Sequence, residues 1–175
     1  MLVVAVTDGE AAYQDSGDLG YIRRAEQERA LAELGVKNSD IVRLTLPDSS
    51  VAACEEELTR FLRPLVGRDT LLVAPWRFDP HPDHEASGRA AERVAENAGV
   101  ILVSYFFWSW HHNKVEALIN LPLSRFDLDE NLQAVRAAAL SHYQSQLEHK
   151  SGSPTLPESL LSPARRPFET FIVHA

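Results

Sequence analysis

Short apolar segments alternate with longer amphipathic segments through the first 105 residues, and this alternation constrains the fold more than any other feature. The apolar segments are rich in Val, Ile, Leu and Ala and lie next to turn-forming residues, as buried strands do. Between them, apolar residues recur at helical spacing, and Gly35 and Gly99 supply helix stops. The expected strands span 2–6, 41–46, 70–74 and 100–105, and the expected helices span 19–34, 51–66 and 85–97.

This alternation predicts an α/β protein with a Rossmann-like, mostly parallel sheet and helices on both of its faces. Beyond residue 105 the pattern is less regular. We expect a strand over 115–121, a helix over 127–150, a loop with four prolines over 151–167 and an edge strand over 171–173. With 175 residues, 45% of them hydrophobic, the chain is long enough to bury a core, so residues 1–175 are expected to form one domain.

Composition excludes several classes of protein. The net charge of −8 is opposite in sign to what a nucleic-acid binder needs, so no nucleic-acid partner is expected. No apolar run approaches the roughly 18 residues of a membrane span. The first residues lack a basic leader, and the single Cys54 suits a reducing compartment, so a cytoplasmic protein is expected.

The loop 75–84 carries the most distinctive chemistry. In parallel sheets ligands bind at the carboxyl ends of strands, which singles out the loops 7–18, 75–84 and 105–113. The second of these places His81, His84 and two aspartates within six residues, a set suited to Zn²⁺ or a similar divalent ion. In the alternative interpretation, Asp83 is a helix N-cap and the histidines are exposed loop residues.

The run His81-Pro82-Asp83-His84, followed by Glu85-Ala86, resembles the second motif of the LmbE/PIG-L family of metal-dependent N-deacetylases, the family of GlcNAc-PI de-N-acetylase. Further matches occur in the family's order, and together they cover nearly the whole chain. They lie at 4–10, at Arg23 and Glu26, at 34–36, 44–48, 105–111, 139–142 and 145–146.

The resemblance implies hydrolysis of the acetamide of an N-acetyl sugar or a secondary-metabolite glycoside by a metal-activated water. His84 matches a metal ligand, and His81 matches the histidine that stabilises the tetrahedral intermediate. Asp83 matches the acidic residue that orients His81. The resemblance further suggests a small N-acetylated partner, which the side chains of Asp8, Glu10, Trp110 and His111 would bind.

The family's first motif, a His-Pro-Asp-Asp run that supplies two metal ligands and the general base, is absent from this sequence. A catalytic zinc needs three protein ligands, so His84 alone does not make a site. Unless the site is completed, we expect this chain to bind no metal and to be inactive as a deacetylase. A rebuilt site could draw on other residues near the same edge of the sheet, with His111, His112, Asp8, Glu10 and Asp79 as the candidates.

The missing segment amounts to one strand and one helix, roughly 30 residues. Its strand is expected to lie centrally, so its absence should leave two unsatisfied sheet edges. Two explanations remain open. Either the start is misplaced and Met1 is an internal residue, or another strand or a partner chain, such as a second copy in a homo-oligomer, fills the gap.

Two other features bear on the interpretation. The aromatic stretch 105–112 could form a pocket wall or a packed turn after a core strand. Arg23 and Glu26, three residues apart on a helix, are expected to form a surface salt bridge.

Two other functions are alternatives to N-deacetylation. The first is that of a non-catalytic, ligand-binding remnant of the same family. A nucleotide-binding domain is remote, because no glycine-rich phosphate motif is present.

Overall fold

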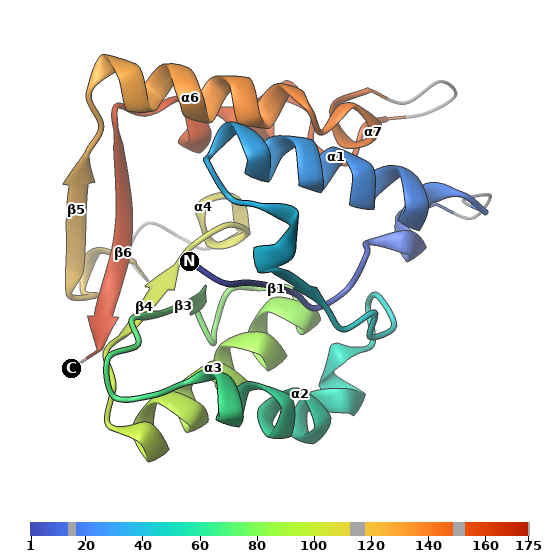
Figure 1. Cartoon of the computed structure of the whole chain (residues 1–175). Coiled ribbons are helices and arrows are strands. Elements are labelled where there is room, and N and C mark those ends of the chain that lie inside the picture. Colours follow the sequence, from blue (N-terminus) through green and yellow to red (C-terminus); the bar gives the residue numbers. More distant parts are fainter. Residues whose placement is uncertain (14–16, 113–117, 149–152, 175) are drawn as a thin grey trace. The chain divides into compact units, whose positions relative to one another are not determined.

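The structure is a computed structural model that describes residues 1–13, 17–112, 118–148 and 153–174 (Figure 1). These residues fall into two compact units. Unit 1 comprises Met1–Asp48 and Asp127–Phe168, and unit 2 comprises Ser49–Phe126 and Glu169–Ala175. The expectation of one domain over residues 1–175 stays a prediction. Among the residues described, no helix combines the length and the apolar composition needed to cross a membrane.

Unit 1 is built on a parallel pair of short strands, β1 (Val3–Ala5) and β2 (Ile41–Arg43). The crossover between them is helix α1 (Leu19–Glu33), which packs along α6 (Glu130–Ser141) and α7 (Gln144–Leu147) (Figure 1). The carboxylate of Asp129 caps α6 by accepting a hydrogen bond from the backbone N–H of Leu132 at 2.8 Å. The remaining elements of unit 1 are η1 (Glu10–Ala12), η2 (Asn38–Asp40), α8 (Glu158–Leu161) and η5 (Pro163–Arg165).

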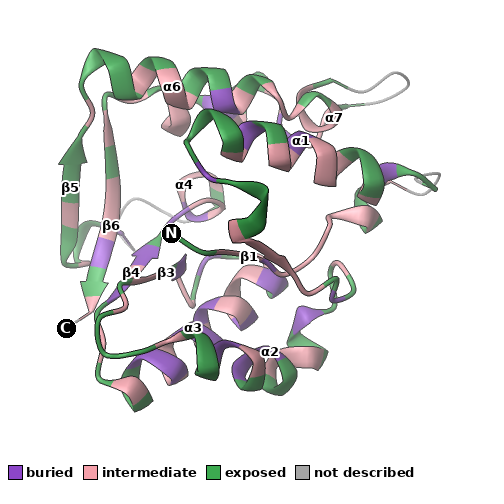
Figure 2. Ribbon diagram, viewed as in Figure 1, coloured by how far each residue is buried: buried purple, intermediate pink, exposed green. Residues whose placement is uncertain are grey.

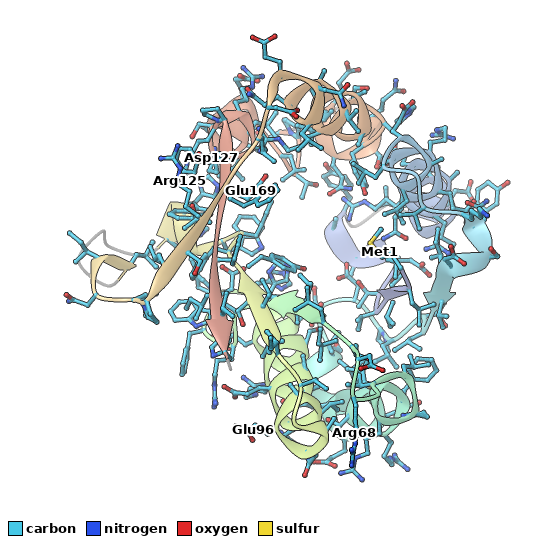
Figure 3. All side chains as sticks on the ribbon, turned by 60° about the vertical axis from the view of Figure 1, so that its left-hand side comes forward. Met1, Arg68, Glu96, Arg125, Asp127 and Glu169 are labelled. Atoms are coloured by element: carbon cyan, nitrogen blue, oxygen red, sulfur yellow. The ribbon has the colours of Figure 1, made fainter. Side chains whose placement is uncertain are left out.

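Unit 2 contains a mixed sheet of order β3-β4-β6-β5. Strands β3 (Leu72–Pro75) and β4 (Leu102–Tyr105) are parallel and joined by helix α3 (Pro82–Ala98), whereas β6 (Phe168–His174) runs antiparallel to β4. Arg68 precedes β3 and Glu96 lies in the last turn of α3, so both lie toward the amino ends of β3 and β4 (Figure 3). The other elements are η3 (Val51–Cys54), α2 (Glu55–Leu62), η4 (Arg63–Leu65), α4 (Ser109–His112) and β5 (Leu123–Asp127).

The α/β class is confirmed, but several boundaries differ from the sequence expectations. The strand expected over 115–121 is not found among the described residues. Residues 115–117 lie outside them, Leu118 and Ile119 are helical, and the next strand is β5, which begins at Leu123. The helix expected over 127–150 ends at Ser141 and restarts as α7. The expected edge strand over 171–173 is the longer β6, which lies between β4 and β5 in the sheet.

Strands β1 and β3 each stand at the end of a sheet. Within the part of the chain that the structure describes, β1 pairs only with β2, and β3 pairs only with β4. Each strand therefore has one edge whose backbone groups face no neighbouring strand. Strands β2 and β5 stand at the other ends of the two sheets and have such an edge as well. That two of these edges result from a missing central strand stays a prediction.

The core of unit 2 lies where α3 packs against β3 and β4, and its buried positions appear along α3 in Figure 2. Small side chains let the helix approach the sheet closely: Ala91 and Ala95 on α3 meet Ala74 on β3 and Leu102 on β4. A second buried cluster contains Phe106, Leu118 and Ile172, with Trp76 and Trp110 packed against it. This packing fixes the position of the loop between β3 and α3.

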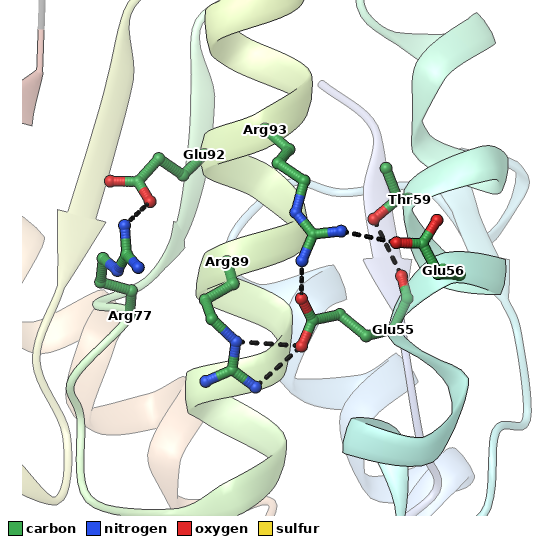
Figure 4. Close-up of polar contacts among 7 residues, drawn as sticks. All are labelled: Glu55, Glu56, Thr59, Arg77, Arg89, Glu92 and Arg93. Carbon is green, nitrogen blue, oxygen red and sulfur yellow. Dashed lines mark hydrogen bonds and ion pairs between the residues drawn. The ribbon is translucent and has the colours of Figure 1, made fainter.

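Ion pairs join α2 to α3 on the outside of the unit (Figure 4). The Glu55 carboxylate accepts hydrogen bonds from Nε and Nη2 of Arg89 at 3.0 and 2.8 Å, and it also pairs with Arg93. Arg93 in turn reaches Glu56 at 2.8 Å. Half-exposed pairs of this kind contribute little singly, but a network that shares one carboxylate holds the two helices in register.

Gly88, on the buried face of α3, sits directly against the end of β3. A Cβ atom at this position would lie 2.6 Å from the carbonyl oxygen of Pro75 and 2.7 Å from the backbone N and Cα of Arg77. Because these neighbours are backbone atoms, they cannot move aside without shifting the loop that follows β3. Glycine is therefore required for α3 to cross the strand at this distance.

We predict that Gly88→Ala destabilises unit 2 by about 1–3 kcal/mol, because the added methyl group overpacks the crossing. Urea unfolding followed by tryptophan fluorescence measures this, since Trp76, Trp108 and Trp110 all lie in unit 2. Gly67→Ala is the matched control, because its Cβ would meet open space, and it should change stability by no more than about 0.5 kcal/mol. Equal unfolding midpoints for Gly88→Ala and the wild type would contradict the packing described here.

Candidate functional site

The loop between β3 and α3 places His81 at the start of the helix. His81 is the N-cap of α3, and its Nδ1 accepts a hydrogen bond from the backbone N–H of Asp83 at 3.2 Å. A neutral imidazole has one donor nitrogen and one acceptor nitrogen. Because Nδ1 is the acceptor, the neutral ring carries its proton on Nε2, which makes that atom a hydrogen-bond donor.

His84, on the first turn of α3, pairs with a fully buried carboxylate. Its Nδ1 lies 2.6 Å from Oδ2 of Asp79, a residue with 0% exposure, while the His84 side chain is 27% exposed. Burial by itself would raise the pKa of Asp79, but hydrogen bonds from His84, Ser109 and Trp108 outweigh burial and lower that pKa to about 2. Asp79 is therefore a carboxylate at neutral pH.

The same carboxylate anchors the segment that follows β4. Asp79 accepts hydrogen bonds from the backbone N–H groups of Phe107, Trp108 and Ser109 at 3.2, 3.1 and 2.7 Å, and from the Ser109 hydroxyl at 2.6 Å. These donors come from residues 28–30 positions later in the chain. Asp79 thus joins the loops after β3 and β4, at the edge of the sheet where ligands bind.

Aromatic rings surround the two histidines. The ring centroids of His81 and His84 are 5.1 Å apart. Trp108 stacks on His81 at 6.1 Å with an interplanar angle of 12°, and Phe107 lies 6.0 Å from His84. The structure therefore brings together two imidazoles, one buried carboxylate and two half-buried aromatic side chains in unit 2.

Asp83, expected to orient His81, contacts it through the backbone N–H. Its buried carboxylate accepts hydrogen bonds from the backbone N–H groups of Ser49 and Val51 at 2.7 and 3.0 Å. The alternative interpretation, in which Asp83 is the N-cap, is wrong by two residues because His81 takes that position. A role for the Asp83 carboxylate in orienting His81 stays a prediction.

The sequence left two interpretations open for the aromatic stretch 105–112, a pocket wall and a packed turn after a core strand, and different residues of the stretch agree with each. Trp110 packs edge-on against the buried Phe106 at 5.5 Å, as a core residue does. His111 lies 6.4 Å from Phe107, and substrate binding by Trp110 and His111 stays a prediction. The rings nearest the two histidines are those of Phe107 and Trp108, which the sequence analysis did not select.

The carboxylates expected to bind substrate from the loop after β1 have partners within unit 1. Asp8 pairs with Arg24 and lies 3.6 Å from Nη1 of Arg43. Oε1 of Glu10 accepts a hydrogen bond from the backbone N–H of Asp48 at 2.9 Å. These contacts tie the segments after β1 and β2 together, and substrate binding by Asp8 and Glu10 stays a prediction.

The expected surface salt bridge between Arg23 and Glu26 is wrong. Glu26 is 2% exposed, and its carboxylate accepts hydrogen bonds from the backbone N–H and the hydroxyl of Ser145 at 2.7 and 2.6 Å. Arg23 donates to the carbonyl oxygen of Gly9 at 2.6 Å. Both residues serve to pack α1 against distant segments, and spacing within one helix gives no sign of such partners.

The described residues do not fit a complete metal site. Among them, no three His, Cys, Asp or Glu side chains lie close enough together to hold a metal ion. Asp79, offered by the sequence as a replacement ligand, instead accepts five hydrogen bonds. Of the three protein ligands that a catalytic zinc needs, the described arrangement offers His84 alone.

Three solved structures with the same fold are deacetylases. The zinc-inhibited form of teicoplanin deacetylase Orf2 has a TM-score of 0.73 and 20% identity, with 98% of this chain and 86% of that chain covered. The A40926 pseudoaglycone deacetylase Dbv21 has a TM-score of 0.64 and 20% identity, with 97% of this chain and 84% of that chain covered. The N,N'-diacetylchitobiose deacetylase of Pyrococcus horikoshii has a TM-score of 0.64 and 20% identity, with 98% of this chain and 71% of that chain covered.

The sequence itself gives the assignment. No curated protein matches it closely enough to count as a relative. Residues 1–95 match the family model described as PIG-L, GlcNAc-PI de-N-acetylase. That match spans more than half of the chain and contains both histidines and Asp79. This chain belongs to the PIG-L family of N-deacetylases.

Proposed function

We propose that this protein hydrolyses the acetamide of an N-acetyl sugar or of a secondary-metabolite glycoside, with His81 and Asp83 in catalytic roles. Three structures that share its fold are deacetylases, one of N,N'-diacetylchitobiose, one of the A40926 pseudoaglycone and one named for teicoplanin. The alternative is a non-catalytic member of the family that binds a small N-acetylated ligand.

The observation that carries the proposal is the hydrogen bond from the backbone N–H of Asp83 to Nδ1 of His81. When water attacks an amide carbonyl, negative charge develops on the carbonyl oxygen. A fixed donor aimed at that oxygen lowers the barrier, because its orientation costs nothing at the moment of reaction. Neutral His81 offers such a donor at Nε2, and the stacked Trp108 helps to hold the ring in place.

The cofactor that we propose is Zn²⁺ or a similar divalent ion, with His84 as one ligand. The pairing of Nδ1 with Asp79 supports this assignment, because it leaves Nε2 of His84 as the ligating atom. When bound, such an ion polarises the carbonyl group and activates water. The described residues provide no complete set of ligands for such an ion.

The remaining proposals concern the surroundings of the site. Phe107 and Trp108 offer an apolar wall of the kind that binds sugar rings and acyl chains.

We further propose a cytoplasmic location for the protein. Among the described strands, β1 and β3 each have an edge that pairs with no other strand, which supports a homo-oligomer in which a second copy covers these edges.

We predict that His81→Gln lowers the rate of acetate release from N-acetylglucosamine or N,N'-diacetylchitobiose by about 10²–10³-fold, since the reaction loses an oxyanion donor. An enzyme-coupled acetate assay measures the rate. His142→Gln, which alters a partly exposed imidazole in unit 1, should leave the rate unchanged. A wild-type chain that binds these sugars without releasing acetate would contradict deacetylation and favour the ligand-binding alternative.

A second prediction concerns the metal. If ligands beyond His84 complete the site, the purified chain should retain about one equivalent of zinc or a similar ion and His84→Ala should lose it, because the variant lacks the proposed ligand. If the site is incomplete, neither protein should hold metal. Elemental analysis after dialysis measures the content, with His142→Ala, which alters a partly exposed imidazole in unit 1, as the control. A wild-type chain without metal, or a His84→Ala variant with full metal content, would overturn the cofactor assignment.

A further inference from the structure

We propose that Phe78 sets the substrate preference of this site by stacking on a flat, apolar group attached to the N-acetyl sugar, such as an aryl aglycone. Phe78 lies in the loop between β3 and α3, three residues before His81. The inference rests on the proposed function and deepens it, because it names the part of the ligand that lies beyond the acetamide and the residue that contacts that part.

Phe78 lies at the tip of a tight turn. The backbone N–H of Asp79 donates to the carbonyl oxygen of Trp76 at 2.8 Å, which closes a four-residue turn with Arg77 and Phe78 at its centre. Glycine, proline and small polar residues usually take such positions, so an aromatic residue here is unusual. Asp79 is fully buried, whereas Phe78 is 56% exposed. The turn therefore presents the aromatic side chain to solvent.

The exposed ring is nevertheless held in place by its neighbours. Trp76 contacts it edge-on, with 5.3 Å between the ring centroids and an interplanar angle of 73°. The guanidinium carbon of Arg77 lies over the ring, 5.0 Å from its centroid, and Arg77 is itself paired with Glu92 on α3. Trp76 in turn contacts the buried Phe106, with 5.3 Å between centroids. Contacts therefore run without a break from the core of unit 2 to the Phe78 ring.

A ring that is both exposed and fixed suits the binding of a ligand. Single exposed apolar residues are common on protein surfaces, so exposure alone would carry no inference. A mobile side chain loses conformational entropy when it binds, and a ring already held by Trp76 and Arg77 avoids most of that loss. Another aromatic group gains most from such a ring, because the two can stack or meet edge to face.

Phe78 is also within reach of the proposed reaction centre. An extended chain spans at most about 3.6 Å per residue, so the Cα atoms of Phe78 and His81 lie within about 11 Å of each other. The hydrogen bond from the backbone N–H of His81 to the carbonyl oxygen of Asp79, at 2.6 Å, fixes the path between them. A ligand whose acetamide lies at His81 and whose sugar carries a further ring is therefore long enough to contact Phe78.

Phenyl and methyl N-acetyl-β-glucosaminide test the proposal, because the two glycosides differ only in the aglycone. Isothermal titration calorimetry of the full chain gives the Kd of each. We expect the wild type to bind the phenyl glycoside about two- to tenfold more tightly, which is the gain typical of an aromatic pair. Phe78→Ala should bind both glycosides with the affinity that the wild type has for the methyl glycoside, and Phe78→Tyr should keep the preference.

Phe126→Ala is the matched control. Phe126 is an exposed phenylalanine of the same unit, 53% exposed on β5, and its replacement should leave the preference for the phenyl glycoside unchanged. Equal Kd values for the two glycosides in the wild type would overturn the proposal, even if Phe78→Ala failed to fold. A preference that survives in Phe78→Ala, or that Phe126→Ala also abolishes, would contradict it as well.

An acetate-release assay on the same glycosides separates this inference from the proposed function. A chain that prefers the phenyl glycoside through Phe78 but releases no acetate would support the stacking role and overturn deacetylation. A chain that releases acetate and binds both glycosides equally would support deacetylation and overturn the stacking role. Binding of neither glycoside would overturn the stacking role and count against the proposed function.

Discussion

The buried carboxylate of Asp79 is the interaction on which the rest of the site depends. A charge without any contact with solvent is tolerated only when donors surround it, and here three backbone amides, one hydroxyl and one imidazole do so. The requirement acts in both directions. The carboxylate needs these donors, and residues 107–109 in turn take the conformation that points their N–H groups at it.

The consequences reach the sheet and the aromatic side chains. Because α3 crosses β3 closely at Gly88, the loop between them has little freedom, and Asp79 is held against His84 on the first turn of the helix. Satisfying its charge brings Phe107 and Trp108 beside His84 and His81. The two imidazoles and the two aromatic rings of unit 2 are therefore arranged around a carboxylate that is itself fully buried.

Sequence reasoning predicted the α/β class, which the structure confirms, and it singled out the loop 75–84 with His81 and His84, because strand patterns and short motifs are local. It did not predict that Asp79 orients His84, since its donors lie 28–30 residues away and backbone N–H groups have no sequence signature. Glu26 was misjudged for the same reason, because its partner Ser145 is 119 residues distant. Where a contact crosses the fold, the residue types along one helix do not reveal it.

Amide hydrogen exchange at Trp108 tests the central claim most directly. If Asp79 organises the site, this amide should exchange slowly although it lies outside regular secondary structure, and Asp79→Asn should accelerate it, because the NH₂ group of Asn cannot accept the bond made to Oδ2. The amide of Val51, bound to Asp83, should keep its rate in both proteins. Rapid exchange at Trp108 in the wild type, or equal rates in wild type and variant, would contradict the account.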